Sequence, residues 1–265
     1  MKSKVFILLI ILVAIYGLIL LVLFVWQEKL LFFPTKLPAS YTFQFEEDFE
    51  EISIQVEKEI HLNALLFKAI QSKGVILFLH GNAGAINTWG FGAPLYLQHQ
   101  YDVLYVDYRG YGKSEGNIQS EQQLISDIQK VYDRLKERYS ENTIIVSGTS
   151  IGTGIATQIA AANHPKLLLL NAPYYSLKKL IQEKTKVLPS FIIRYSLATH
   201  QYINKVECPI YLFHGQSDQL IPVHHAKELK QKAEQINLIV LEGTGHNDIP
   251  ANSLYQEKMG EILMK

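Results

Sequence analysis

The stretch that decides the fold is Gly148-Thr149-Ser150-Ile151-Gly152, a serine with glycine on both sides. It directly follows the strand-like run 143–146 and directly precedes the helix-like run 155–162. The order strand, tight turn, helix would lift the Ser150 hydroxyl above a sheet edge, on a turn so sharp that flanking side chains would clash. The stretch therefore predicts a nucleophilic serine on a strand-to-helix elbow.

Length and composition allow one folded domain and exclude several kinds of site. The chain has 265 residues, of which 48% are hydrophobic and 19% charged, which is sufficient for a full hydrophobic core. The 25 Lys and Arg residues balance 25 Asp and Glu residues, so net charge gives no support for nucleic-acid binding. Cys208 is the single cysteine, which rules out an intramolecular disulfide and a cysteine-built metal cluster. We expect neither a metal nor an organic cofactor.

The N-terminus carries an apolar stretch long enough to cross a membrane. The 22 residues from Val5 to Trp26 contain no charge and would form a helix of about 33 Å, against a hydrocarbon core of about 30 Å. A cleaved signal peptide is the alternative, but its apolar region is only about 7–15 residues long and ends at small residues. This stretch ends in Phe24-Val25-Trp26. We predict an uncleaved anchor over residues 1–29.

The charges that flank this stretch indicate its orientation. Lys2, Lys4 and the free amine precede it, whereas Glu28 partly offsets Lys29 after it. Positively charged flanks tend to stay in the cytoplasm. We therefore expect a cytoplasmic N-terminus and an extracytoplasmic catalytic domain, joined by a connector over residues 30–44.

Strand-like and helix-like runs alternate from residue 45 onward. Apolar side chains alternate over residues 51–56, which predicts a half-buried antiparallel strand that pairs with residues 62–68. Further strands are expected over residues 75–79, 103–106, 143–147, 166–170, 209–213 and 238–241, and helices over residues 120–138, 155–162, 223–234 and 253–265. The alternation predicts an α/β fold over residues 45–265, with a mostly parallel central sheet and helices on both faces.

One segment interrupts this alternation. Residues 173–206 contain no clear strand and carry aromatic and basic side chains, among them Tyr174, Phe191 and Arg194. An insertion at this point lies over the carboxyl ends of the parallel strands. We predict a short helical lid; a packed helical excursion is the blander alternative and is compatible with it.

A nucleophilic serine needs a base to take its proton and an acid to orient that base. His246 lies in a glycine-rich loop after the last apolar run, from which an imidazole can reach back over the sheet edge. Asp218 follows the preceding run, whereas Asp248 is only two residues from His246 and Asp107 precedes the serine in the chain. The order Ser150, Asp218, His246 is the one used by hydrolases with this elbow, and it predicts the catalytic triad.

An oxyanion hole requires two fixed N–H groups where negative charge develops. The Ile151 amide, directly after the serine, is the first expected donor. The second should come from the loop His80–Gly84, which follows the strand 75–79. The Asn82 amide is our prediction and the Ala83 amide the close alternative. His80 itself is better suited to hold this loop in shape than to act as a second base.

With these residues assembled, the chain resembles the α/β-hydrolase superfamily from Phe45 to Leu263, and within it the small membrane-anchored hydrolase-domain proteins. The resemblance rests on His80–Gly84, Asp107–Gly112, the Ser150 elbow, Asp218 with Ile221-Pro222, and Gly245–Asp248. The anchor followed by Gln27–Pro34 also looks like that group. The resemblance implies hydrolysis of carboxylic esters or thioesters through an acyl-enzyme. Some eukaryotic relatives remove acyl chains from protein cysteines, and others in the superfamily are lipases or aminopeptidases.

We therefore expect a serine hydrolase that acts on acylated or amphipathic, lipid-like substrates near a bilayer. An aminopeptidase on the same triad is one alternative; an acidic patch in the lid would favour it, whereas this lid is basic. A membrane-tethered scaffold without activity is another, although such a protein would not need to keep the whole set of catalytic residues. Dehalogenase and epoxide-hydrolase chemistry would require an aspartate at position 150.

Overall fold

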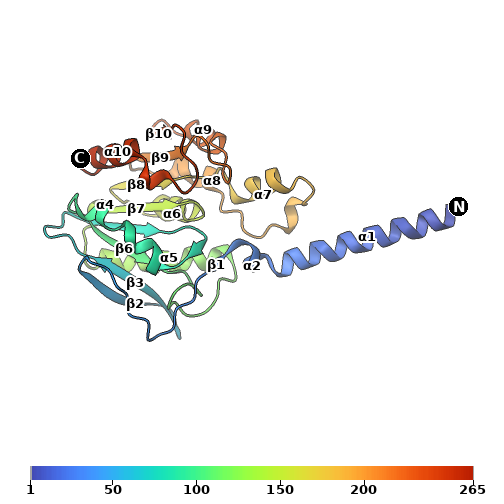
Figure 1. The fold of residues 1–265 in the computed structure, drawn as a ribbon, viewed down its shortest axis with the longest axis horizontal. Coiled ribbons are helices and arrows are strands. Elements are labelled where there is room, and N and C mark those ends of the chain that lie inside the picture. Colours follow the sequence, from blue (N-terminus) through green and yellow to red (C-terminus); the bar gives the residue numbers. More distant parts are fainter. Residues whose placement is uncertain (1, 265) are drawn as a thin grey trace.

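The computed structural model describes residues 2–264, and Figure 1 shows a long helix that projects from an α/β body. This helix, α1 (Lys2–Val25), contains no buried residue and is long and apolar enough to cross a membrane. A helix satisfies its backbone hydrogen bonds internally, so a helix with exposed apolar side chains suits contact with lipid. The chain kinks at Trp26 and enters the short helix α2 (Gln27–Leu31).

An eight-stranded sheet forms the centre of the body, in the order β10-β9-β8-β7-β4-β6-β3-β2. Its strands are β2 (Phe49–Glu57), β3 (Ile60–Phe67), β4 (Val75–Leu79), β6 (Asp102–Val106), β7 (Ile144–Thr149), β8 (Leu167–Asn171), β9 (Ile210–Gly215) and β10 (Ile236–Leu241). β3 runs antiparallel to both β2 and β6, and the other neighbours are parallel. The mostly parallel sheet predicted from the sequence is confirmed.

Helices cover both faces of the sheet, as predicted. Neighbouring residues of β4 point to opposite faces, so Leu77 packs with α5 and α6, whereas Phe78 packs with α4 and α10. The helices outside the inserted segment are α3 (Ile86–Trp89), α4 (Pro94–Leu97), α5 (Glu121–Lys136), α6 (Gly152–Ala162), α9 (His224–Lys230) and α10 (Ser253–Leu263), with 3-10 turns η1 (Gly90–Gly92), η2 (Glu141–Thr143) and η5 (Ile249–Ala251). The core is thus two apolar layers separated by one sheet.

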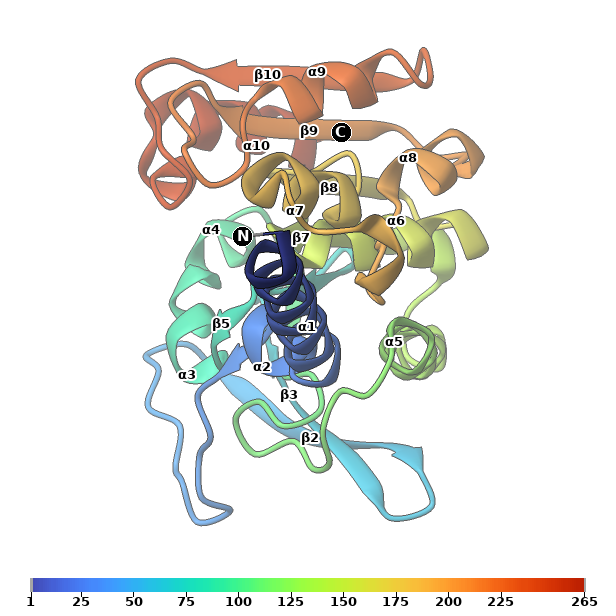
Figure 2. The same ribbon diagram turned by 90° about the vertical axis from the view of Figure 1, so that its right-hand side faces the viewer.

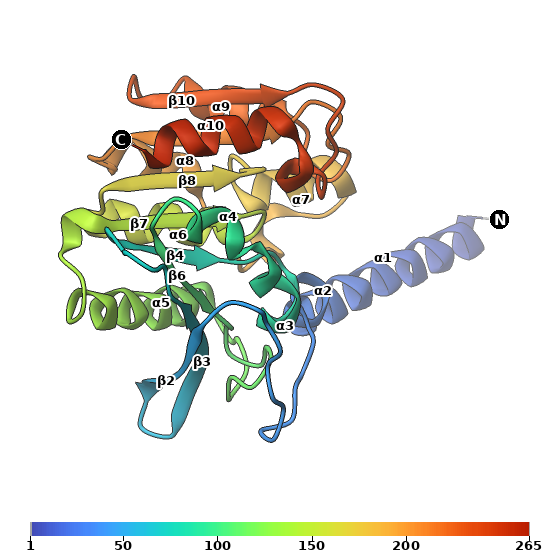
Figure 3. The same cartoon turned by 60° about the vertical axis from the view of Figure 1, so that its left-hand side comes forward.

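The parallel strands end on the side of the body from which α1 projects, as the arrowheads of β8 and β10 show in Figure 3. Loops that follow these strands therefore lie on the same side as the anchor helix. In open α/β sheets this edge is where ligands bind. The fold directs its functional edge toward α1.

The inserted segment folds into short helices (Figure 2), of which η3 contacts α1 and α8 packs on α6. It contains α7 (Leu177–Thr185), η3 (Ser190–Ile192), α8 (Thr199–Tyr202) and η4 (Ile203–Lys205). The Tyr16 hydroxyl of α1 donates a hydrogen bond of 2.8 Å to the Val187 carbonyl. A second, two-stranded sheet pairs β1 (Phe33–Pro34) with β5 (Ala83–Gly84) in parallel. These contacts join the N-terminal segment to the inserted segment and to the loop that follows β4.

Candidate active site

The elbow around Ser150 is so tight that it requires glycine at both positions 148 and 152. Ser150 connects β7 to α6 with a φ of 54°, a left-handed value that non-glycine residues rarely adopt. A methyl group added at Gly148 would lie 2.5 Å from the Gly152 carbonyl oxygen, and one at Gly152 would lie 2.2 Å from the Leu79 carbonyl oxygen. Any larger residue at either position would therefore displace the turn. Local strain at a serine is a feature of functional sites.

The loops after β9 and β10 bring an imidazole and a carboxylate to this serine. His246 Nε2 lies 3.1 Å from Ser150 Oγ, and His246 Nδ1–H donates to Asp218 Oδ2 at 2.6 Å. Asp248, the nearer carboxylate in sequence, instead accepts the Gly245 N–H at 3.1 Å. The structure thus brings together the three residues expected for the triad and directs Asp248 to its own loop.

Asp218 is held as a carboxylate. Its Oδ1 accepts the N–H groups of Leu220 and Ile221, both at 2.8 Å. Burial alone would raise the pKa of Asp218, but hydrogen bonds from His246 and from the Ile221 N–H outweigh it and lower the pKa below its usual value. A charged Asp218 keeps the imidazole proton on Nδ1 of His246. The Nε2 lone pair is then free to accept a proton from Ser150.

His214, a residue to which the sequence reasoning gave no role, supports the acid from behind. It is the penultimate residue of β9 and fully buried, and its Nε2–H donates to the Ile221 carbonyl at 2.7 Å. The same nitrogen lies 3.5 Å from Asp218 Oδ2. Burial lowers the pKa of His214, so the ring is neutral and does not compete with His246 for the carboxylate. It fixes the loop that carries Asp218.

The loop His80–Gly84 lies directly against the serine. A methyl group added at Gly81 would lie 3.7 Å from Ser150 Cβ. Within residues 2–264, neither the Asn82 N–H nor the Ile151 N–H donates to a protein acceptor. An oxyanion hole needs two amides without a protein acceptor near the nucleophile, and these two stay the predicted donors.

His80 is engaged in shaping this loop. Its ring is fully buried, and Nδ1–H donates to the Gly81 carbonyl at 2.6 Å. Nε2 lies 3.5 Å from Asp107 Oδ1, and burial raises the pKa of Asp107. Asp107 also accepts the Ile86 N–H at 3.0 Å. These contacts match the structural role expected for His80.

A cavity of about 630 Å³ opens at Ser150 and His246. Its walls come from the segment around α3 and α4, from η5 and the start of α10, from strands β4 and β6, and from the loops that follow β4, β7 and β9. Side chains with aromatic rings or branched apolar groups dominate it: Phe78, Trp89, Phe91, Leu95, Tyr96, Tyr105, Leu220, Ile249 and Tyr255. Among the residues that line the cavity there is no Asp, Glu, Lys or Arg. The space beside the serine suits an uncharged, largely apolar group.

No residue of the inserted segment 173–206 lines this cavity. The sequence reasoning therefore missed the actual walls, of which Trp89 and Tyr255 are examples. Their signal in the sequence was a group of aromatic residues over 89–96 and the single aromatic Tyr255 in the last helical stretch, which is equally typical of core packing. The role of this segment as a lid stays a prediction, and its part around η3 contacts the anchor helix.

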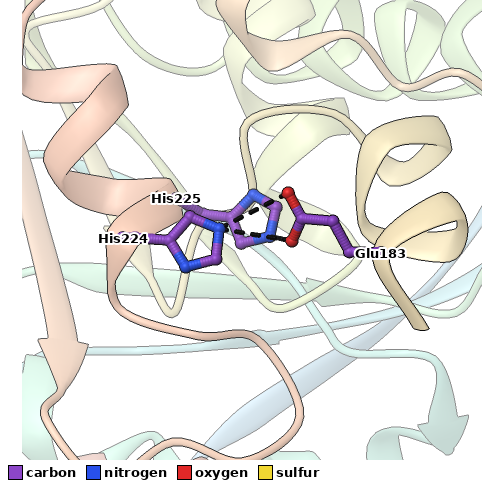
Figure 4. Close-up of side chains that lie close together, drawn as sticks. All are labelled: Glu183, His224 and His225. Atoms are coloured by element: carbon purple, nitrogen blue, oxygen red, sulfur yellow. Dashed lines mark hydrogen bonds and ion pairs between the residues drawn. The ribbon is translucent and has the colours of Figure 1, made fainter.

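A second cluster of ionisable groups joins α7 to α9 (Figure 4). Glu183 Oε2 lies 3.2 Å from His224 Nε2 and 3.1 Å from His225 Nε2, the spacing of possible metal ligands. The Tyr175 N–H donates to His225 Nδ1 at 3.2 Å, so the proton of this ring is on Nε2 and points at Glu183. Burial lowers the pKa of His225, which keeps the ring neutral. The cluster therefore connects the inserted segment to α9 through hydrogen bonds.

We expect metal chelation and metal addition to leave the protein unchanged, because the His225 nitrogen that faces Glu183 carries a proton. EDTA should not alter kcat/KM, and zinc should not raise the melting temperature. The measurements are enzyme assays and thermal unfolding with each reagent. A zinc-dependent rise in melting temperature that disappears in Glu183→Gln would contradict this assignment.

Comparison with known proteins finds matches among hydrolases. The family model described as serine aminopeptidase, S33, matches residues 70–199. Human alpha/beta hydrolase domain-containing protein 17B is 28% identical over 200 residues, which cover 72% of this chain and 67% of that protein. The zebrafish (Danio rerio) lysophosphatidylserine lipase ABHD12 is 31% identical over 197 residues, which cover 63% of this chain and 50% of the lipase.

Solved structures share the fold at lower identity. The Pyrococcus furiosus esterase Pf2001 superposes with a TM-score of 0.69 at 21% identity, over 88% of this chain and 97% of that one. Est1E from Butyrivibrio proteoclasticus gives a TM-score of 0.65 at 16% identity, over 81% and 97% of the two chains. Together with the sheet order and the serine elbow, these matches show that the chain belongs to the α/β-hydrolase superfamily.

Proposed function

We propose that the protein is a serine hydrolase that cleaves carboxylic ester or thioester bonds of acylated, lipid-like substrates. The observation that carries the proposal is the cavity beside Ser150, which has a predominantly apolar lining and no Asp, Glu, Lys or Arg. An acyl chain is the group that such a space accepts next to a nucleophile. Names of relatives that include a lipase and an esterase agree with this substrate class.

The proposed reaction proceeds through an acyl-enzyme. Ser150 Oγ attacks the acyl carbonyl carbon while His246 Nε2 accepts its proton, and Asp218 stabilises the resulting imidazolium. The amides of Ile151 and Asn82, with Ala83 as the alternative to Asn82, bind the oxyanion. The leaving alcohol or thiol takes the proton from His246. Water then attacks the acyl-enzyme by the same route, which releases the carboxylic acid and restores Ser150 without a cofactor.

An aminopeptidase is the main rival, and the matched family model bears that description. Such an enzyme must bind a free ammonium group within reach of the serine, which requires a carboxylate near the scissile bond. The cavity lining has no acidic residue. The same lining also argues against a non-catalytic scaffold, since a scaffold has no use for an apolar cavity beside an aligned serine and histidine.

For location we propose that residues 1–29 anchor the chain through α1 and that residues 45–265 form the catalytic domain, with 30–44 as connector. The N-terminus would be cytoplasmic and the catalytic domain extracytoplasmic, because Lys2 and Lys4 precede the helix. The strand ends that carry Ser150 lie on the side of α1, so the substrate would meet the site near the bilayer.

A series of p-nitrophenyl esters and acyl thioesters of increasing chain length, beside aminoacyl amides, tests the substrate class. We expect hydrolysis of the acyl substrates and none of the aminoacyl amides. Replacing Leu95, which lines the cavity, with tryptophan should fill it and lower kcat/KM about 10-fold or more for long chains but spare acetyl esters. Gln98→Trp is the matched control, because Gln98 directly follows α4, is exposed and does not line the cavity. Preferential cleavage of aminoacyl amides would refute the proposal.

A further inference from the structure

The segment that follows the anchor helix, Gln27–Thr35, has no role in the reaction described so far, yet it lies against the active-site loop. β1 in this segment pairs with β5, which belongs to the loop His80–Gly84. The Phe33 N–H donates to the Asn82 carbonyl at 2.8 Å, and the Thr35 N–H donates to the Gly84 carbonyl at 3.0 Å. The contact is made by the backbone on both sides.

Further hydrogen bonds hold the same loop from other directions. The Tyr111 hydroxyl also donates to the Asn82 carbonyl, at 2.8 Å, and Trp89 Nε1–H donates to the Ala83 carbonyl at 2.9 Å. Asn82 Nδ2–H donates to the Leu31 carbonyl at 3.3 Å. Every carbonyl from 82 to 84 therefore has a donor, and the segment after the anchor supplies two of these donors.

Fixing these carbonyls fixes the direction of the amides. A trans peptide unit is planar, so its N–H points opposite to its C=O. The bond from Phe33 to the Asn82 carbonyl therefore orients the Ala83 N–H, and the bond from His80 to the Gly81 carbonyl orients the Asn82 N–H. These amides are the two candidates for the second oxyanion donor. The orientation of the Ala83 amide therefore depends on a strand that lies outside the catalytic sheet.

The other end of the segment is attached to the inserted segment 173–206. The Gln27 side chain is only 7% exposed; its Nε2–H donates to the Ile192 carbonyl at 2.9 Å, and its Oε1 accepts the Arg194 N–H at 2.7 Å. Glu28 accepts the Tyr195 hydroxyl at 2.8 Å and pairs with the Arg194 guanidinium. A buried glutamine with both ends of its amide paired marks a fixed joint rather than a flexible tether.

We propose that residues 27–35 are a positioning element of the active site, which holds the oxyanion loop and links it to the anchor helix and the inserted segment. Phe33 and Thr35 are positioning residues in this proposal, and they touch no substrate. Phe33 acts through the Ala83 amide, and Thr35 holds β1 in register on the loop so that Phe33 stays bonded to the Asn82 carbonyl. The inference rests on the proposed function. It explains why the stretch Gln27–Pro34 lies directly after the membrane helix: from there it can hold the loop that supplies an oxyanion amide.

The test uses the full chain in detergent micelles and compares Thr35→Pro with Lys36→Pro. Proline at 35 removes the N–H that bonds Gly84. The Lys36 N–H makes no hydrogen bond within residues 2–264, so Lys36→Pro adds the same ring without that loss. A trifluoromethyl ketone probes the oxyanion hole, because Ser150 Oγ adds to its carbonyl carbon, His246 takes the proton and the carbonyl oxygen becomes an oxyanion. The matching secondary alcohol fills the same cavity without forming one.

We expect Thr35→Pro to lower kcat/KM about 10-fold or more, less than the roughly 10²–10³ that follows outright loss of one donor. The inhibition constant of the ketone should rise by the same factor. The inhibition constant of the alcohol and the melting temperature of Thr35→Pro should equal those of Lys36→Pro. Pro34→Gly, which loosens β1 but keeps its N–H groups, should shift the ketone in the same direction by a smaller factor, and it decides the matter if Thr35→Pro does not fold.

Equal kcat/KM and equal ketone binding in Thr35→Pro and Lys36→Pro would overturn the inference. So would a parallel loss of ketone and alcohol binding, since that indicates general damage to the cavity. If the wild-type chain neither hydrolyses acyl substrates nor binds the ketone, the proposed function itself is wrong and this inference falls with it. That result is visible before any variant is compared.

Discussion

Ser150→Ala is expected to lower kcat by about 10⁴-fold or more, which leaves only the contribution of the oxyanion amides and substrate binding. The hydroxyl that lies 3.1 Å from His246 Nε2 is the one nucleophile in reach of that base within residues 2–264, and alanine removes it without adding volume to the elbow. The fold should be retained, since the Ser150 N–H still donates to the Asn171 carbonyl. Circular dichroism and thermal unfolding check this.

The direct measurement is labelling by a fluorophosphonate probe together with the rate of ester hydrolysis. Ser253→Ala is the control, because Ser253 is exposed at the start of α10 and does not line the cavity. It should label and turn over like the wild type. Labelling that persists undiminished in Ser150→Ala would refute the assignment of the nucleophile.

Asp218→Asn is expected to lower kcat about 10⁴-fold with little change in stability. The asparagine oxygen can still accept the N–H groups of Leu220 and Ile221. Its NH₂ group, however, would donate to His246 Nδ1 and move the ring proton to Nε2. In that tautomer the imidazole has no lone pair for the Ser150 proton. Pre-steady-state acylation rates measure the loss.

Asp248→Asn is the matched control, since among the described residues the Asp248 carboxylate accepts only the Gly245 N–H and does not bond the imidazole. It should keep most of the activity. The pKa of Asp218 is lowered from its usual value of 3.8. The carboxylate is therefore ionised at every pH above 3.8, and it loses its charge only as the pH falls through the lowered pKa. The deficit of Asp218→Asn should therefore be the same throughout the neutral range. A deficit that vanishes there would contradict the triad assignment.

Short-range chemistry made the elbow, the sheet and the order of the three catalytic candidates predictable from the sequence. At Gly148 and Gly152 only glycine avoids a clash with neighbouring backbone, so the pattern around Ser150 encodes its own turn. Apolar runs such as 75–79 are buried on both faces, and strands of that kind form the centre of a parallel sheet. Loops at the carboxyl ends of such strands share one edge, which is why residues far apart in sequence could be assigned to one site.

What the sequence by itself determined is therefore this framework, together with an apolar N-terminal helix. Only the tertiary structure decided that Trp89 and Tyr255 wall the cavity, that residues 173–206 contact α1 rather than the cavity, and that Phe33 bonds the Asn82 carbonyl. The physical reason is the range of the interactions. A turn or an alternating strand is encoded by neighbours a few residues apart, whereas cavity walls and backbone pairing between distant segments depend on how the whole chain packs, and aromatic side chains carry the same local pattern in a core as in a pocket.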